Sequence, residues 1–294
     1  SMEIRGSDKY LTEASLTADN IKVLMMLAVV LYHSCMFFTG SWFDSVTPIY
    51  EAKYLSGLAR WLNTFHVQSF TMASGYLFYC LRTEKGKYNN FRKDIVKRGK
   101  RLLLPYFCVM ITWAIPFDIY YGNFSFSKMM NNYILGCAPS QLWFLPMLFL
   151  LFVVFYRFLN EKHISTKGMI AVAVISLGGG YLFDRIGTNF FQISTAIKYA
   201  GYYYLGAYLY SRTIENNWIM PITGFGSIAF FLLGKMIKEN PTVSIVVRLI
   251  GTALRYICPY MGVIFIYCIV KKITEKSNRH KKFKIWCKFK ENSF

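Results

Sequence analysis

The sequence DNIKVLMMLAVVLYHS fills residues 19–34 and places an unbroken apolar run, residues 23–32, between Lys22 and His33. Apolar character continues beyond this stretch, so the run approaches the roughly 20 residues that a helix needs to cross the hydrocarbon core of a bilayer. Because lipid offers the backbone no hydrogen-bond partners, a run of this kind forms a helix. The stretch therefore predicts a transmembrane helix over residues 22–39.

Seven more apolar runs follow along the chain. They are residues 57–80, 102–121, 142–158, 168–184, 198–210, 218–236 and 245–270. The whole chain is 54% hydrophobic and only 17% charged, which is more apolar and less charged than soluble proteins of this size. The sequence therefore predicts an all-α, polytopic transmembrane bundle of about eight membrane helices. We expect one domain over residues 1–270 and a basic cytoplasmic tail over residues 271–294.

Positive charge is concentrated in the segments between the apolar runs. The formal net charge is +19, and the largest clusters of Lys and Arg occupy residues 82–101 and 271–290. The positive-inside rule places such clusters in the cytoplasm, which predicts a multi-pass protein of the inner (plasma) membrane with both termini cytoplasmic. The clusters also suit contact with anionic lipid head groups. They lack the interleaved aromatic residues of a nucleic-acid surface, so we expect no nucleic-acid partner.

The seven cysteines are scattered and are never spaced as CxxC. This pattern is typical of free thiols that pack as small apolar side chains. It favours neither a disulfide framework nor a zinc site. We therefore expect no metal centre.

The first predicted helix carries three ionisable residues at informative spacings. Lys22 and His33 are eleven residues apart, so they share one helix face and lie roughly 16 Å apart along the axis. Asp19 is three residues before Lys22 and can form an ion pair with it. Lys22 alone could be a snorkelling anchor at the helix end. His33 lies three turns into an apolar helix, where an ionisable side chain is costly and therefore a candidate functional residue.

A second histidine, His66, lies near the outer end of the second apolar run. By itself it could be an interfacial histidine that is hydrogen-bonded to a neighbour. Because His33 also lies toward the outer half of an adjacent, connected helix, the two histidines together predict a shared polar cavity.

Five short segments occur in a characteristic order between residues 19 and 210. They are Asp19-x-x-Lys22 with ten residues before His33; Phe65-His66 with Phe70 and Ser74-Gly75-Tyr76-Leu77; Arg98-Gly99-Lys100-Arg101 with Pro105-Tyr106; Leu142-Trp143-Phe144-Leu145; and Tyr204-Leu205-Gly206. In this order they resemble the signature segments of the acyltransferase-3 family of membrane O-acyltransferases, particularly its fucose 4-O-acetylase-like branch. Members of that family commonly have more membrane helices than are counted here, so this chain resembles a C-terminally shortened member.

The resemblance implies a reaction and a set of partners. Similar proteins move an acetyl or similar acyl group from coenzyme A to a carbohydrate hydroxyl, so acetyl-CoA would be the acyl donor and a cell-envelope or exported glycan the acceptor. His33 would be the general base that takes the hydroxyl proton, since neutral imidazole is available near physiological pH. His66 could orient the acceptor, assist proton transfer or fix the tautomer of His33, and the residues do not choose among these roles.

Coenzyme A is anionic, and cations at the cytoplasmic mouth would hold its phosphates. Arg98 and Arg101 lie one turn apart if the third helix begins early, and arginine suits bidentate phosphate contacts. Lys22 lies at the same membrane level in the predicted topology. Without the resemblance, we would interpret the two arginines as charges that set the topology.

Three further residues are candidates for binding the acceptor. Asp19 lies beside Lys22, and Trp143 could line the cavity or anchor its helix at the membrane interface. Arg255 lies deep in the eighth run, where it could face the acceptor or an acidic partner such as Asp184.

Two other functions are compatible with the same residues. The protein could be a transporter or flippase for a glycan or lipid-linked sugar, with the histidines relaying protons. It could also be an inactive, shortened family member. The sequence does not specify the acceptor, the acyl group or the oligomeric state.

Overall fold

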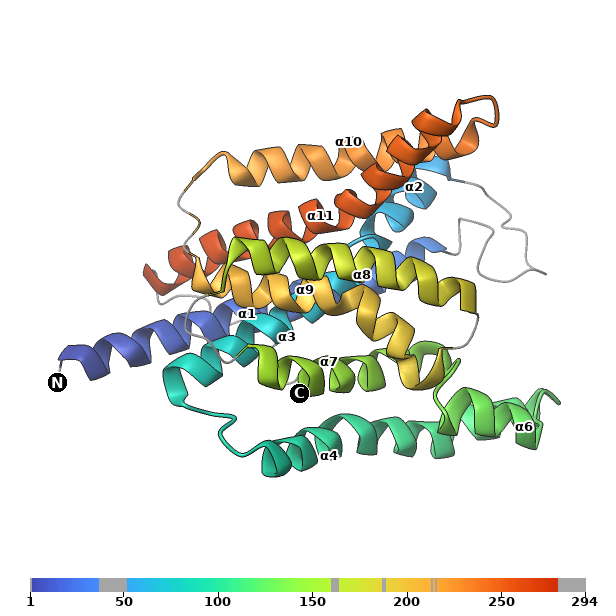
Figure 1. Cartoon of the computed structure of the whole chain (residues 1–294), viewed down its shortest axis with the longest axis horizontal. Helices are drawn as coiled ribbons and strands as arrows, with labels where there is room; N and C mark the ends of the chain where they lie inside the picture. The colour runs from blue at the N-terminus through green and yellow to red at the C-terminus, as the bar shows by residue number, and fades with distance from the viewer. Residues whose placement is uncertain are drawn as a thin grey trace. The chain divides into compact units, whose positions relative to one another are not determined.

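The computed structural model describes residues 2–36, 52–159, 164–186, 189–212, 214 and 216–279. All of the regular elements within these ranges are helices (Figure 1). The prediction of an all-α protein is therefore confirmed for the part of the chain that the structure describes.

Five helical segments among the described residues are long and apolar enough to cross a membrane. They are Glu13–Met36, Phe91–Tyr120, Gln141–Phe158, Ile219–Glu239 and Ile245–Lys276. The structure thus supports a membrane protein with several spanning helices. The further spans that were expected near 57–80, 168–184 and 198–210 are helical but do not meet the same standard of length and apolar character.

The chain forms two compact units, each of which is described separately. The terminal unit comprises Ser1–Leu77 and Thr213–Phe294, and the middle unit comprises Phe78–Arg212. The boundary falls inside one helix, α3 (His66–Lys85), which belongs in part to each unit.

The terminal unit contains four helices besides the first half of α3. They are α1 (Met2–Met36), α2 (Lys53–Asn63), α10 (Ile219–Glu239) and α11 (Ile245–Arg279). Helix α10 packs along α11, and α1 packs against both α2 and α11. Helix α11 continues past residue 270 and so includes the start of the segment that was expected to be a tail; the rest of that segment, from residue 280, lies outside the described residues.

Helix α1 buries one stripe of small and apolar side chains. Ala14, Ala18, Ile21, Met25 and Ala28 recur at spacings of three and four residues and are at most 9% exposed. This spacing places them on one face of a helix, and small residues let neighbouring helices approach closely in a membrane. Helix α1 therefore presents a fixed face to the rest of the terminal unit.

The apolar run over 57–80 is two helices, not one. Helix α2 ends at Asn63 and α3 begins at His66. At the break, the Thr64 hydroxyl donates a 2.7 Å hydrogen bond to the Trp61 carbonyl, and Phe65 packs directly against Gly262 of α11. The break therefore makes His66 the first residue of α3.

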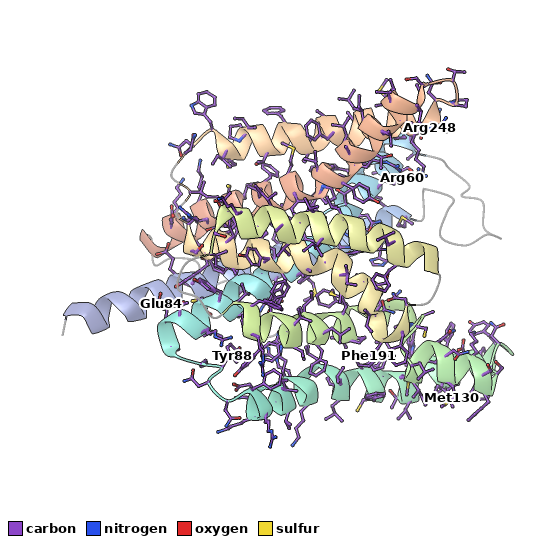
Figure 2. All side chains as sticks on the ribbon, in the orientation of Figure 1. Arg60, Glu84, Tyr88, Met130, Phe191 and Arg248 are labelled. Carbon is purple, nitrogen blue, oxygen red and sulfur yellow. The ribbon has the colours of Figure 1, made fainter. Side chains whose placement is uncertain are left out.

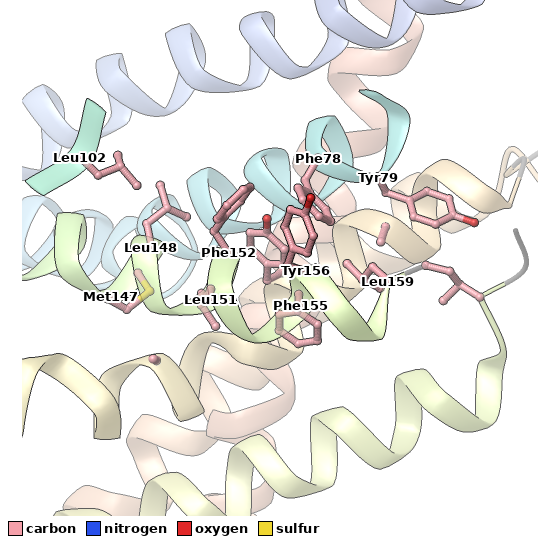
Figure 3. Close-up of a cluster of buried hydrophobic side chains, with 14 residues drawn as sticks. Phe78, Tyr79, Leu102, Met147, Leu148, Leu151, Phe152, Phe155, Tyr156 and Leu159 are labelled. Atoms are coloured by element: carbon pink, nitrogen blue, oxygen red, sulfur yellow. The ribbon is translucent and has the colours of Figure 1, made fainter. Parts of the chain in front are cut away.

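The middle unit surrounds a cluster of aromatic and aliphatic side chains. Its elements are the second half of α3, α4 (Phe91–Val109), η2 (Met110–Ala114), α5 (Ile115–Tyr120), α6 (Phe126–Lys128), η3 (Met129–Ile134), η4 (Ser140–Trp143), α7 (Phe144–Phe158), α8 (Thr166–Ile186), η5 (Phe190–Gln192) and α9 (Ile193–Ser211). Figure 3 shows Phe78, Phe152, Phe155 and Tyr156 within this cluster. The ring of Phe155 stacks on that of Tyr203, with centroids 5.2 Å apart. Aromatic packing therefore connects α3, α7 and α9 within this unit.

Candidate functional site

The structure brings His33 and His66 together around the ring of Tyr32. The centroid of the Tyr32 ring lies 4.9 Å from that of His33 and 5.2 Å from that of His66. His66 is only 3% exposed, whereas His33 is partly exposed. Two histidines from different helices thus share one aromatic neighbour in the terminal unit.

Each histidine contacts a backbone carbonyl oxygen four residues earlier in the chain. The Nδ1 atom of His33 lies 2.8 Å from the Val29 carbonyl oxygen, and that of His66 lies 2.9 Å from the Leu62 carbonyl oxygen. Since a carbonyl oxygen can only accept a hydrogen bond, Nδ1 carries the proton in both rings. In the neutral imidazole the lone pair is then on Nε2, which is the atom that can accept a proton.

Lys22 and Asp19 form the ion pair that their spacing predicts. The Lys22 ammonium lies 3.7 Å from the Asp19 carboxylate, and both side chains are about a quarter exposed. Because α1 is continuous from Met2 to Met36, Lys22 and His33 lie on the same face, roughly 16 Å apart along the axis. A cation and an imidazole therefore lie on the same side of one helix.

A buried hydrogen bond fixes the level of α1 against α11. The Asn20 side-chain amide donates to the Thr274 hydroxyl at 2.9 Å, and both residues are buried. This bond places the Asp19–Lys22 ion pair next to the end of α11 that carries Lys271 and Lys272.

That end of α11 borders a hollow of about 300 Å³, here called the Lys271 hollow. It is lined by Ile214, Asn216, Asn217, Met220, Tyr267, Cys268, Lys271, Lys272 and Glu275. The Lys271 ammonium lies 6.0 Å from the centre of the Tyr267 ring, a distance at which cation and ring still attract. This hollow was not predicted from the sequence, because Lys271 and Lys272 were expected to lie in a basic cytoplasmic tail. The pairing of two lysines with two asparagines at the ends of neighbouring apolar runs was the available signal.

Arg255 borders a second hollow of the terminal unit, of about 320 Å³, here called the Arg255 hollow. It is lined by Arg60, Thr64, Phe231, Lys235, Lys238, Glu239, Arg255 and Cys258. Arg255 is exposed there, and its guanidinium lies 3.5 Å from the Thr252 hydroxyl oxygen. The proposed acidic partner of Arg255, Asp184, has a side chain that lies outside what the structure describes.

Arg98 and Arg101 belong to the middle unit and lie on α4. The Asn90 side chain caps the start of this helix by accepting a 3.1 Å hydrogen bond from the Lys93 backbone N–H. The helix thus begins early enough to put the two arginines one turn apart. Arg98 is partly buried, with its guanidinium 5.2 Å from the centre of the Phe152 ring, whereas Arg101 is exposed.

The Nε atom of Arg98 is buried and has no hydrogen-bond partner among the described residues. The terminal nitrogens of the Arg98 guanidinium and the exposed Arg101 one turn away are the groups that would suit the phosphates of an anionic substrate. Burial raises the pKa of the nearby Tyr88, and the positive charges of Arg98 and Arg101 oppose that shift. The positive charges of both arginines therefore influence the pKa of the same loop residue, Tyr88.

Trp143 lies at the edge of the aromatic cluster of the middle unit. Its ring centroid is 6.0 Å from that of Phe144 and 5.5 Å from that of Tyr199. The ring is partly buried. Trp143 is therefore a packing residue of this cluster in the structure, and its contact with a substrate stays a prediction.

The comparisons with known proteins give a family. A family model described as "Acyltransferase domain", that of the acyltransferase-3 family, matches residues 16–272. No curated protein and no solved structure matches the sequence significantly. The matched range contains α10, most of α11, and both histidines. The chain therefore belongs to the acyltransferase-3 family of membrane acyltransferases.

Proposed function

We propose that this protein transfers an acetyl or similar acyl group from acyl-CoA, at the cytoplasmic side of the plasma membrane, to a hydroxyl group of a cell-envelope or exported glycan. The proposal includes about eight membrane helices with both termini in the cytoplasm, and the fucose 4-O-acetylase-like branch of the family. The observation that carries it is the contact of His33 and His66 with the same ring, that of Tyr32, in the terminal unit. Lys22, which is paired with Asp19, lies three turns earlier on the same face of α1 as His33.

The histidines supply the proton transfer that the reaction needs. A sugar hydroxyl is a weak nucleophile, and it becomes a strong one as a base removes its proton. Nε2 of His33 is suited to take this proton, because the Val29 carbonyl keeps the other ring nitrogen protonated. His66 has the same tautomer through Leu62 and would orient the acceptor hydroxyl or assist the proton transfer. As the new ester C–O bond forms, the C–S bond of the thioester would break, and the coenzyme A thiolate would leave and take up the proton from the His33 imidazolium.

Cations of the chain would hold the phosphates of the donor. Within the terminal unit, Lys22 and the Lys271 hollow lie at the same end, since Asn20 bonds to Thr274. Within the middle unit, Arg98 and Arg101 present guanidinium groups on one face of α4. Asp19 partly neutralises the charge of Lys22. Lys271 and Lys272 of the hollow would therefore attract an anion more strongly than Lys22 does.

Transfer by the purified protein tests the proposal. The protein, reconstituted in lipid nanodiscs, is mixed with radiolabelled acetyl-CoA and envelope glycans extracted from cells that lack it. We expect label to appear in the glycan, and mass spectrometry to find an acetyl group that the untreated glycan lacks. Binding of coenzyme A without transfer to any glycan fraction would indicate an inactive family member and would contradict the proposal.

Neutralising the Lys271 hollow should weaken donor binding. In the double variant K271Q/K272Q we expect the KM for acetyl-CoA to rise roughly tenfold with kcat little changed, since each lost charge-assisted hydrogen bond contributes about 1.5–3 kcal/mol and solvent exposure reduces this. The matched control is K276Q, which removes an exposed lysine of α11 that does not line the hollow. An unchanged KM in the double variant would remove this hollow from donor binding.

A further inference from the structure

The Arg255 hollow collects positive charge from three helices of the terminal unit. Its lining includes Arg60 of α2, Lys235 and Lys238 of α10, and Arg255 of α11. Glu239 is the one carboxylate among the lining residues, and it lies 3.9 Å from the Lys235 ammonium. Four cations and one carboxylate leave the hollow strongly positive.

Three of these cations form no ion pair with a carboxylate of the described residues. Among the described residues, no carboxylate lies within ion-pair distance of Arg60, Lys238 or Arg255. Like charges in one hollow repel one another, and this repulsion is relieved when an anion binds between them. The arrangement therefore favours an anionic ligand.

The backbone of α10 is shaped to admit Arg255. Gly234 is buried, and a Cβ atom added there would lie 2.7 Å from Cγ of Arg255. Any larger residue at position 234 would push the stem of Arg255 away from α10. The stem of Arg255 therefore lies against the backbone of α10 at Gly234, and its exposed guanidinium lines the same hollow as Lys235.

The hollow borders the helix break that precedes His66. Thr64, which directly follows α2, and Cys258 of α11 both line it, and the Cys258 thiol lies 3.9 Å from the Thr64 hydroxyl. His66 begins α3 two residues after Thr64. A ligand in this hollow would therefore lie next to the segment that positions one of the two histidines.

The two hollows lie toward different ends of α11. Arg255 and Lys271 are sixteen residues apart on this helix, which corresponds to roughly 24 Å along its axis. With the donor at the Lys271 end, the Arg255 end is available for the other substrate. In Figure 2, Arg60 is labelled at the same end of this unit as Arg248.

We propose that the Arg255 hollow binds an anionic group of the acceptor, a phosphate or a carboxylate, and so selects acidic acceptors. This inference rests on the proposed function. The volume of about 320 Å³ is at the lower end of the range for small-molecule pockets, enough for one phosphate or one acidic sugar. Two guanidinium groups, Arg60 and Arg255, can each grip such a group with paired hydrogen bonds.

Anion binding to the reconstituted protein tests the inference. The protein is placed in nanodiscs of phosphatidylcholine alone, and titration calorimetry measures the binding of inorganic pyrophosphate, glucuronate and, as a neutral control, glucose. We expect both anions to bind and glucose not to bind. We expect R255Q and K238Q each to weaken binding of pyrophosphate by about tenfold, the effect of losing one charge-assisted contact.

The matched control for these variants is R248Q. Arg248 is an exposed arginine of α11, two turns before Arg255, and it does not line the hollow. Its nearest polar contact is the Pro241 carbonyl oxygen, at 3.4 Å. Loss of binding in R248Q equal to that in R255Q would show attraction by the general positive charge and would overturn the site. The variant G234A adds a second check, because it should weaken binding while keeping every charge.

Two further measurements complete the test. The first distinguishes an acceptor from lipid head groups as the source of the anion, and the second distinguishes failure of this inference from failure of the proposed function. In nanodiscs that contain phosphatidylglycerol, continued binding of pyrophosphate supports an acceptor site. If pyrophosphate does not bind to the protein in these nanodiscs, lipid head groups occupy the hollow and the assignment to the acceptor is wrong. Acetyl-CoA binding, measured on the same nanodiscs, reports on the proposed function independently. Absent pyrophosphate binding with intact acetyl-CoA binding overturns only the acceptor site.

Discussion

Replacing His33 by Gln should reduce acyl transfer by at least about a hundredfold, because a general base commonly contributes 10²–10⁴-fold to the rate. Glutamine is polar and similar in length, but its amide nitrogen does not accept a proton. The hydrogen bond from Nδ1 to the Val29 carbonyl leaves Nε2 as the basic atom of the wild-type ring, and this atom is what the variant loses. The measurement is kcat for transfer of radiolabelled acetyl to the extracted glycan.

The control for His33 is its neighbour on the same helix. In S34A the lost group is an exposed hydroxyl that donates a 2.9 Å hydrogen bond to the Val30 carbonyl, and we expect kcat to stay within about twofold of wild type, as surface changes usually have small effects. If H33Q kept the wild-type rate while remaining folded, His33 could not be the base. H66Q then separates the open roles of His66: a rise in the acceptor KM indicates orientation, and a fall in kcat alone indicates proton transfer.

Replacing Gly262 by Ala should destabilise the terminal unit and reduce transfer together. A Cβ atom at position 262 would lie 2.7 Å from Cδ1 of Phe65 and 2.8 Å from its Cβ and Cγ. Because Cβ and Cγ of Phe65 are close to its backbone, the ring cannot simply swing aside. Overpacking of this kind typically costs about 1–3 kcal/mol. Thermal unfolding in detergent and the transfer assay measure the two effects.

A second-site change identifies the cause of this loss. F65A removes Cγ and Cδ1 of the ring and keeps Cβ, so it relieves part of the clash with the added methyl group. We therefore expect the double variant G262A/F65A to be more stable than the sum of the single variants predicts, which is a test of direct contact. The matched control is G57A, since a Cβ atom there meets no other group within 4 Å. A G262A protein as stable as G57A would mean that the approach of α11 to the helix break is looser than described.

Much of α1 could be predicted from the sequence, because the relevant interactions are local. The apolar run over 23–32 contains no Gly or Pro, and the helix is continuous through it. The Asp19–Lys22 ion pair follows from a spacing of three residues. The fact that His33 and His66 share Tyr32 as a neighbour was not predictable in detail, although two connected helices made their proximity reasonable.

The break before His66 could not be predicted from its own segment. Residues 57–80 contain no proline and are apolar enough to suggest one helix. At the interruption, Phe65 packs against Gly262, almost two hundred residues away. The segment by itself does not reveal this tertiary contact.

The two hollows could not be predicted from the sequence for a related reason. Arg60 is far in the sequence from Lys235 and Lys238, and each of these residues is typical of a charge near a helix end. Packing of α2, α10 and α11 brings them to one place. The contact of Arg98 with the Phe152 ring likewise joins residues more than fifty positions apart, so the residues around Arg98 do not distinguish it from a solvated side chain.

The hydrogen bond between Asn20 and Thr274 joins two helices, α1 and α11, whose bonded residues are 254 positions apart in the chain. During synthesis the ribosome must therefore extend the chain past Thr274 before these two residues can meet. Until then His33 and His66 have already been made, but α11, which carries Lys271 and Lys272, is still being translated or inserted. Under the proposed function, a nascent chain would consequently hold its proton-accepting groups without the lysines expected to bind the donor, and it would gain activity only after α11 has been added.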